Sequence, residues 1–226
     1  FLVNRILAPY LSEAVRLVRE GCRIEDVDRV MTDFGMPVGP LALLDDIGLD
    51  VAVKAGEVLQ AAFRERIKSG GDEALVAAGR LGRKSGAGFY EYDSAGGKRG
   101  APAKAAYEAL RAEPKPEPPF PPDVIESRLL LPMVNEAAFC LEDGVVGSAG
   151  KLDLALILGT GFPPYTGGLL RWADSLGLPR VRYLLEELTG KFGPRFEPAP
   201  SIRRLADARG GFHQPTGVSA GAEAAS

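Results

Sequence analysis

The sequence predicts an all-α protein built from two tandem copies of one helical domain. Apolar residues recur every three to four positions along most of the 226 residues, the spacing of one face of a helix. The segment 1–21 returns in altered form at 124–144, about 125 residues later. No pair of segments shows the alternation of a half-buried strand. A short extended piece is expected only near residues 88–92.

The two copies share a series of landmarks in the same order. An Arg, a Pro and a Glu-Ala pair come first, and a Gly-apolar-Pro turn follows. A repeat of this length is too long for a solenoid and indicates a duplicated domain. Asn4 of the first copy is replaced by Ser127 in the second. The shared landmarks are Arg5, Pro9, Glu13, Ala14 and Gly35-Met36-Pro37 in the first copy, and Arg128, Pro132, Glu136, Ala137 and Gly161-Phe162-Pro163 in the second.

The first copy is expected to consist of short helices separated by Gly and Pro. Pro9 lies inside the first helix, where it removes one backbone donor. Pro40 suits the first turn of a helix, and Asp50 can cap the next one. Three glycines in 81–92 indicate a loop that ends in the extended piece. The expected helices span 1–21, 24–34, 40–47, 50–67, 72–79 and 101–112.

The second copy repeats this plan after a Pro-rich spacer, EPKPEPPFPP. No equivalent of GRKSGAGFYEY is evident in it, and from Gly210 onward the Gly, Ala, Ser and Pro content predicts a disordered tail. Helices are expected at 124–142, 152–158, 169–176, 179–188 and 201–208. The predicted division is a first domain at 1–112, a linker at 113–122, a second domain at 123–212 and a tail at 213–226.

Composition narrows the class of protein. The chain is 46% hydrophobic and 25% charged, as in globular proteins, and its net charge of -3 gives no reason to expect nucleic acid or an anionic membrane surface as a partner. No apolar run is long enough to span a membrane. Cys22 and Cys140 show no motif spacing, so we expect a reduced, cytoplasmic protein. Because the chain begins at Phe1 without a signal-peptide pattern, we expect it to be part of a longer protein.

Few residues point to chemistry on their own. Neither Gly86 nor Gly159 begins a complete GxGxxG, and two separated Cys with one His predict no metal site. His213 falls in the expected tail and is read as incidental. Asn4 is either the cap of the first helix, which its spacing favours, or a neutral amide donor facing a ligand oxygen. Lys84, in a Gly-rich loop, is either a solvated cation or a partner of a phosphate.

Structural roles are favoured for the charged residues that recur. Glu13 and Glu136 lie in the middle of helices, and we expect them to accept hydrogen bonds from a neighbouring helix end. Arg5 and Arg128 are expected to be structural as well.

The motifs of the first copy resemble those of the 3-hydroxyacyl-CoA dehydrogenases. VNRILAPYLSEAVRL, GMPVGPLALLDDIGLD and GRKSGAGFYEY look like the C-terminal helical domain of that family, and GFPPYTGGLLRWADSLG is similar to the second such domain of the multifunctional β-oxidation proteins. Those proteins join an enoyl-CoA hydratase domain, an NAD-binding domain and two helical domains. The resemblance covers nearly all of 1–212 and implies a fold like the C-terminal domain of 6-phosphogluconate dehydrogenase.

This resemblance implies oxidation of L-3-hydroxyacyl-CoA to 3-ketoacyl-CoA with NAD as cofactor, in fatty-acid β-oxidation. The family's catalytic His, oriented by a Glu, belongs to a Rossmann domain expected upstream of Phe1, so the chain alone is expected to be inactive. Asn4 matches the Asn of the VNR motif, which implies a catalytic, substrate-binding amide. Lys84 matches a position that reaches the cofactor.

The second copy departs from the family at the site, because Ser127 replaces the Asn. Family members dimerise through the helical domain, so the resemblance implies that the second copy is an internal stand-in for that partner, packed in pseudo-twofold fashion. One alternative is a non-catalytic scaffold for dimerisation or for docking a β-oxidation partner such as a thiolase. Another is a related hydroxyacid or sugar dehydrogenase.

Overall fold

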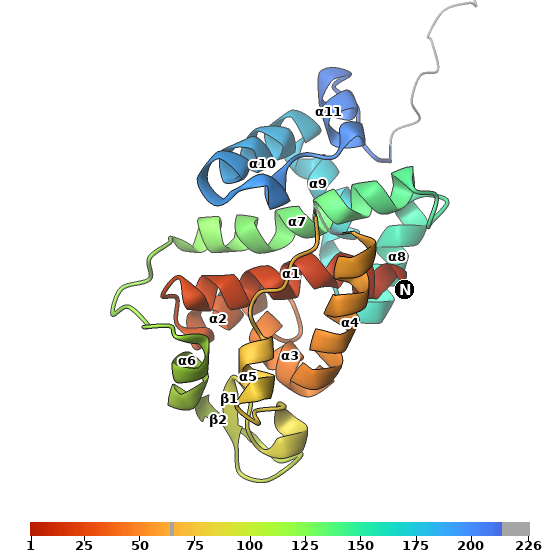
Figure 1. The fold of residues 1–226 in the computed structure, drawn as a ribbon. Helices are drawn as coiled ribbons and strands as arrows, with labels where there is room; N and C mark the ends of the chain where they lie inside the picture. The colour runs from red at the N-terminus through yellow and green to blue at the C-terminus, as the bar shows by residue number, and fades with distance from the viewer. Residues whose placement is uncertain (64–65, 214–226) are drawn as a thin grey trace, which may run out of the picture.

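The computed structural model describes residues 1–63 and 66–213, and over these ranges the chain is mostly helical (Figure 1). The first copy contains α1 (Leu2–Arg19), α2 (Ile24–Phe34), α3 (Pro40–Ile47), α4 (Leu49–Ala62), α5 (Glu73–Ala77) and α6 (Lys104–Leu110). The second contains α7 (Pro122–Glu142), α8 (Ala149–Thr160), α9 (Leu169–Leu176), α10 (Leu178–Phe192) and α11 (Pro200–Asp207). The predicted all-α class with two copies is confirmed.

Helices α1 and α7 form the centre of the molecule and lie side by side (Figure 1). Each is continuous through its internal proline, Pro9 or Pro132. Their apolar stripes are buried against each other and against the remaining helices in one continuous core. The aromatic ring of Phe34 in α2 meets the rings of Phe162 and Trp172 at centroid distances of 5.8 Å, so side chains of the two copies also interlock away from the central helices.

Two reciprocal ion pairs join α1 to α7. Arg5 Nε donates to Glu136 Oε1 at 2.6 Å, and Arg128 Nε donates to Glu13 Oε1 at 2.8 Å. Both guanidinium groups are at most 1% exposed. The pairing order shows that α1 and α7 run antiparallel. The structural roles expected for these residues are therefore confirmed, although each Glu accepts from an Arg of the other copy and not from a helix end.

The same correspondence extends to buried aspartates. Asp28 accepts from the backbone N–H groups of Leu41 and Ala42 at the start of α3. Asp153 accepts in the same way from Leu170 and Arg171 at the start of α9. These carboxylates satisfy donors that have no partner inside a helix, and they suit the positive end of the helix dipole.

The approach of each aspartate to its helix requires glycine. A Cβ built on Gly39 would lie 2.3 Å from Asp28, and one built on Gly168 would lie 2.3 Å from Asp153. Any side chain there would displace the carboxylate, so the glycines of the Gly-Pro and Gly-Gly landmarks are explained by close packing.

The second copy does have a remnant of the Gly-rich segment, contrary to the prediction. In the first copy Asp45 accepts from the backbone N–H groups of Phe89 and Tyr90. In the second copy Asp174 accepts from the backbone N–H groups of Phe212 and His213. Gly-Phe-His at 211–213 thus takes the place of Gly-Phe-Tyr at 88–90, and sequence comparison missed it because only these three residues remain.

His213 is consequently packed, although the sequence placed it in a disordered tail. Its Nε2 lies 3.0 Å from Asp153 Oδ2 and its Nδ1 lies 2.8 Å from Asp174 Oδ2. In the first copy the Tyr90 hydroxyl donates to Asp28 at 2.7 Å, so the imidazole replaces a phenol at the matching position. The remainder of the predicted tail, 214–226, lies outside the described residues.

Two further details differ from the prediction. A second strand, β2 (Arg99–Pro102), pairs antiparallel with β1 (Tyr90–Tyr92), so the extended piece is one side of a small hairpin. Arg-Gly-Ala-Pro contains no β-branched or aromatic residue, so the sequence pattern predicts a turn there and not a strand.

The helix caps also differ from the prediction. Asn4 does not cap α1, whose N-cap is Phe1, and the residue that precedes α4 is Gly48 and not Asp50.

The buried Asp45 is expected to make stability fall as pH rises. Burial raises the pKa of Asp45 to about 6 from an ordinary value of 3.8. Between these values the folded state retains a proton that the unfolded chain has released. The free energy of unfolding therefore falls by about 3 kcal/mol in total as pH rises through this window. Urea denaturation at a series of pH values measures the slope.

Asp45→Asn is the control for that slope, because an amide does not titrate. The variant is expected to be less stable throughout, since its NH2 group must replace one of the two oxygens and so face the N–H donor of either Phe89 or Tyr90, but its pH slope should be flatter. Equal slopes in the two proteins would contradict the assignment.

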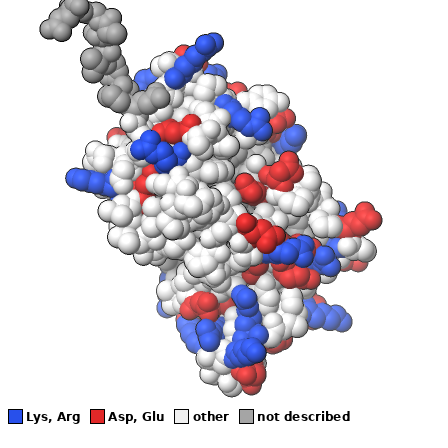
Figure 2. Space-filling view, turned by 180° about the vertical axis from the view of Figure 1, so that it is seen from behind, with Lys and Arg blue, Asp and Glu red and all other residues white. Residues whose placement is uncertain are grey.

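The surface carries charges of both signs. On the face seen in Figure 2, Lys and Arg lie beside Asp and Glu, and a broad area is uncharged, so this face offers no extended basic surface. Within the described residues, no helix is both long enough and apolar enough to cross a bilayer.

Candidate functional site

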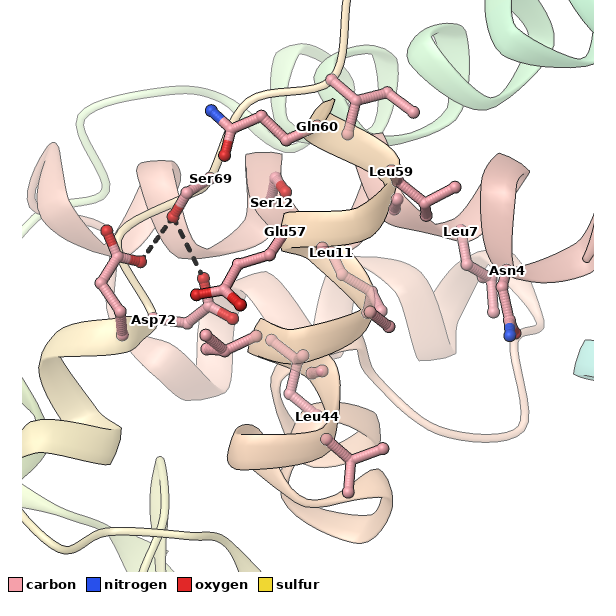
Figure 3. Close-up of a pocket in the computed structure, with 18 of the residues that line it drawn as sticks. Asn4, Leu7, Leu11, Ser12, Leu44, Glu57, Leu59, Gln60, Ser69 and Asp72 are labelled. Atoms are coloured by element: carbon pink, nitrogen blue, oxygen red, sulfur yellow. Dashed lines mark hydrogen bonds between the residues drawn. The ribbon is translucent and has the colours of Figure 1, made fainter. Parts of the chain in front are cut away.

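A cavity of about 290 Å³ opens between α1, α4, the end of α3 and the segment 67–73 (Figure 3). Ligand sites in proteins are typically concave and largely apolar, with a few polar groups that orient the ligand. This cavity has that character, with Asn4 at one end and a group of polar side chains at the other (Figure 3).

Small side chains leave space between the two helices. Ala8 of α1 and Ala52, Ala55 and Gly56 of α4 all line the cavity. A Cβ built on Gly56 would meet no atom within 4 Å, so there is open space in front of this residue. The α4 residues that line the cavity are Val51, Ala52, Val53, Ala55, Gly56, Glu57, Leu59 and Gln60, and the small ones, Ala52, Ala55 and Gly56, share one face of the helix. That face could have been found in the sequence as a stripe of small residues, but its meaning depends on α1 standing opposite.

The middle of the cavity is apolar. Its walls are branched aliphatic side chains from three helices and the following loop. Leu59 and Ile67 are nearly buried, whereas Val51 is half exposed at the rim. The branched aliphatic lining residues are Leu7, Leu11, Leu44, Ile47, Val51, Val53, Leu59 and Ile67. A surface of this kind favours a hydrocarbon over water.

The end remote from Asn4 is polar. Ser69 Oγ donates to Glu73 Oε2 at 2.5 Å and lies 3.5 Å from Asp72 Oδ1. Burial, together with the charge of Glu73, raises the pKa of Asp72. Gln60 and Glu57 lie on α4 near this end (Figure 3). The apolar part of the cavity therefore ends at carboxylates and hydroxyls that require water or hydrogen bonds.

Arginines of α1 hold the segment that closes this end. Arg16 Nη2 donates to the carbonyls of Lys68 and Ser69, and Arg19 Nη1 donates to the carbonyl of Gly70 at 3.3 Å. These contacts attach 67–73 to the same helix that carries Asn4. The two ends of the cavity are therefore positioned by one rigid element.

Asn4 lies in the first turn of α1 with its side chain exposed and on the cavity lining. A carboxamide keeps a neutral NH2 donor at every accessible pH. Asn4 therefore contributes an accessible neutral amide to one end of the cavity.

Lys84 lies in a 3-10 turn (Arg83–Ser85) and is separate from the cavity lining. Its ammonium pairs with Asp50 in the first turn of α4, and the hydrogen bond from Lys84, helped by its charge, lowers the pKa of Asp50. The Lys84 side chain is 47% exposed. Asn4 and Lys84, the two site residues predicted from the sequence, are therefore not in contact, although Val51 beside Asp50 lines the cavity.

The described residues offer no other obvious reactive centre. Within 1–63 and 66–213, no three His, Cys, Asp or Glu side chains are arranged to hold a metal ion. Cys22 and Cys140 are free and buried, and burial raises the pKa of each thiol to about 11. His213, the one histidine, has a carboxylate at each ring nitrogen and packs in the second copy.

Comparisons with known proteins agree with this architecture. The family model described as 3-hydroxyacyl-CoA dehydrogenase, C-terminal domain, matches residues 1–92 and again 125–218. The chain is 39% identical over 215 residues to the fatty acid oxidation complex subunit alpha of Shewanella sp. (strain ANA-3), covering 94% of this chain and 30% of that protein. It is 42% identical over 204 residues to the protein of the same name from Vibrio cholerae serotype O1, covering 89% and 28%.

A solved structure shows the same fold. The chain superposes on 3-hydroxybutyryl-CoA dehydrogenase from Escherichia coli K12 with a TM-score of 0.72 at 26% identity, covering 92% of this chain and 60% of that one. The chain thus spans about 30% of the length of the curated relatives that it matches. Both of its copies match the family model, and the chain belongs to the 3-hydroxyacyl-CoA dehydrogenase C-terminal domain family.

Proposed function

We propose that the full-length protein is an NAD-dependent L-3-hydroxyacyl-CoA dehydrogenase that forms 3-ketoacyl-CoA in fatty-acid β-oxidation, and that this chain supplies one side of its active site. The observation that carries the proposal is the position of Asn4, exposed at the end of an apolar cavity. The family membership and the similarity to fatty acid oxidation complex alpha subunits support it.

The proposed role of Asn4 is to donate a hydrogen bond to the oxygen on C3 of the substrate. Negative charge develops on this oxygen when its proton is removed during oxidation. A fixed neutral donor stabilises that charge more than it stabilises the hydroxyl group of the ground state, which lowers the barrier. Because Asn4 sits on the first turn of a long helix, its backbone is held in place without help from the ligand.

The residues described here do not fit an NAD site. Dinucleotide sites use a strand, a Gly-rich turn and a helix N-terminus, whereas the sheet in residues 1–63 and 66–213 is an antiparallel two-stranded hairpin. His213 is fixed between two aspartates, so it does not suit the role of general base. We therefore assign the cofactor fold and the catalytic base to the part of the relatives' length that this chain does not span.

Lys84 is proposed to reach the cofactor from the edge of the site. Its half-exposed ammonium is held by Asp50 at the start of α4, one residue before the cavity wall. A lysine tethered in this way can turn toward a phosphate supplied by another domain.

The domain division at 112 and 123, and the role of the second copy as an internal stand-in for a dimer partner, are part of the same proposal. The reciprocal pairs Arg5–Glu136 and Arg128–Glu13 support it, since a self-complementary interface between two identical domains would show each contact twice. Ser127 at the position of Asn4 leaves the second copy without the amide.

The name of the relatives suggests the location and the partner proteins that we propose. They are alpha subunits of a complex, so we propose a cytoplasmic assembly with another β-oxidation enzyme such as a thiolase, and an enoyl-CoA hydratase domain in the same chain. A purely scaffolding role would not require an apolar cavity beside an exposed amide, which is why the enzymatic function is preferred.

The test is turnover by the full-length protein. Acetoacetyl-CoA and NADH are expected to react, with loss of NADH absorbance, and 3-hydroxybutyryl-CoA with NAD+ is expected to give the reverse reaction. Absence of turnover with hydroxyacyl- and ketoacyl-CoA substrates of every chain length would refute the dehydrogenase and favour the docking scaffold.

A further inference from the structure

We propose that the cavity between α1 and α4 holds the acyl chain of the substrate up to about its twelfth carbon. The inference rests on the proposed function, because the reacting carbon is assigned to Asn4. The inference assigns the acyl chain to a binding site and gives the length of chain that the site can contact. Neither follows from the reaction alone.

The length of the cavity follows from α1. Asn4 and Ser12 both line it and are eight residues apart. A helix advances 1.5 Å per residue, so these positions are separated by about 12 Å along the axis. An extended chain advances by about 1.25 Å per carbon, so roughly nine methylene groups fit beyond C3.

The lining matches a hydrocarbon over this distance. Leu7 and Leu11 of α1, Ala55 and Leu59 of α4, and Leu44 of α3 all line this part of the cavity. A polar group in this region would lose its hydrogen bonds to water without finding partners, whereas a methylene group gains by leaving water. The chemistry of the cavity therefore favours an apolar chain over a polar one.

The polar end of the cavity explains why the binding free energy should stop improving as the acyl chain becomes longer. Ser69 donates a hydrogen bond to Glu73 at that end and lies 3.5 Å from the carboxylate of Asp72. A longer chain would have to displace water from two carboxylates, and this cost offsets the gain from each additional methylene. The affinity is thus expected to level off where the polar group begins.

The open space in front of Gly56 provides a sharp test. A phenylalanine at this position would project into the middle of the cavity, and a Cβ there meets nothing within 4 Å, so the backbone has no reason to shift. Gly is also a poor helix former, which makes the substitution favourable for α4 itself. Val58, on the same helix, is 70% exposed and points away from the cavity, so Val58→Phe is the matched control.

The experiment measures kcat/KM of the full-length protein for 3-hydroxyacyl-CoA substrates from four to sixteen carbons. We expect a rise of about twofold to fourfold per methylene up to about twelve carbons, followed by a plateau. In Gly56→Phe the ratio of the twelve-carbon to the four-carbon value is expected to fall at least tenfold, and in Val58→Phe it should stay at the wild-type value. Ala55→Leu narrows the cavity from the same helix and should lower the ratio in the same direction.

The possible failures are distinguishable. An active enzyme with a flat chain-length profile, or with an unchanged ratio in both filling variants, would overturn the acyl site and leave the dehydrogenase function standing. Loss of all oxidation in the wild-type protein would instead overturn the proposed function. Circular dichroism melting of each variant shows whether α4 remains folded.

Discussion

Replacing Asn4 by alanine in the full-length protein is expected to lower kcat for 3-hydroxyacyl-CoA oxidation by about 10²–10³, the usual effect of removing one donor to a developing oxyanion. The loss should appear mainly in kcat, because the hydrogen bond is stronger in the transition state than in the ground state. The Asn4 side chain is exposed, so the melting temperature should hardly change. Steady-state kinetics with saturating NAD+ measure the effect.

The matched control is Ser127→Ala, which removes the side-chain oxygen at the corresponding position of the second copy. This variant should keep the wild-type kcat, since Ser127 does not line the cavity. Asn4→Asp separates hydrogen-bond donation from size, because an ionised carboxylate of nearly the same shape can only accept. A fully active Asn4→Asp or Asn4→Ala protein would remove Asn4 from the proposed chemistry.

Replacing Arg5 by methionine is expected to lower the free energy of unfolding by about 3–5 kcal/mol. The change removes the Arg5 partner at 2.6 Å from the Glu136 carboxylate, which is 4% exposed, and leaves it with the Arg66 guanidinium at 3.8 Å. Burial already raises the pKa of Glu136, so the charge is poorly tolerated without a cation in direct hydrogen-bond contact. Urea denaturation followed by the fluorescence of Trp172, the single tryptophan, reports the loss, because this ring packs against Phe34 of the other copy.

Two comparisons test the cause of that loss. Arg182→Met breaks an exposed pair with Glu186 at 2.8 Å and should cost less than about 1 kcal/mol. The double variant Arg5→Met/Glu136→Met should recover much of the stability, since two apolar side chains replace both buried charges. If the single and double variants are equally unstable, the loss of stability comes from the packing of the Arg5 side chain. The idea that it comes from the unpaired Glu136 charge would then be wrong.

Much of the fold could be predicted from the sequence because its signals are local. Helical periodicity, Pro at first turns and Gly at helix ends depend on neighbours in the chain, and these gave the helices and the duplication. The partners of Glu13 and Glu136 could not be found in this way. Both copies display an Arg and a Glu, but only the antiparallel packing of α1 on α7 shows that the pairs cross between the copies.

The features that the sequence did not predict also depend on contacts between residues that are distant in the chain. The hairpin depends on pairing between Tyr90 and Pro102, and β2 lacks strand-forming residues. His213 looked incidental because Gly-Phe-His is a short remnant of the longer first-copy segment. Its role depends on Asp153 and Asp174, which are distant in sequence.

One part of the candidate site could be predicted from the sequence, and the other part could not. Asn4 could be singled out by its motif and by its replacement in the second copy. The cavity beside it could not, because Ala52 and Gly56 in an isolated sequence are indistinguishable from ordinary helix residues. They become informative only when the structure shows that they line one cavity with Ala8 of α1 and that the space in front of Gly56 is unfilled.

A crystal structure of the full-length protein with a bound 3-ketoacyl-CoA would test the role of Asn4 most directly. The C3 oxygen is expected within about 3 Å of the Asn4 amide nitrogen, with the acyl chain running along α1 toward Ser69. A ligand whose C3 oxygen is bound elsewhere, with the Asn4 amide turned to solvent, would contradict the account.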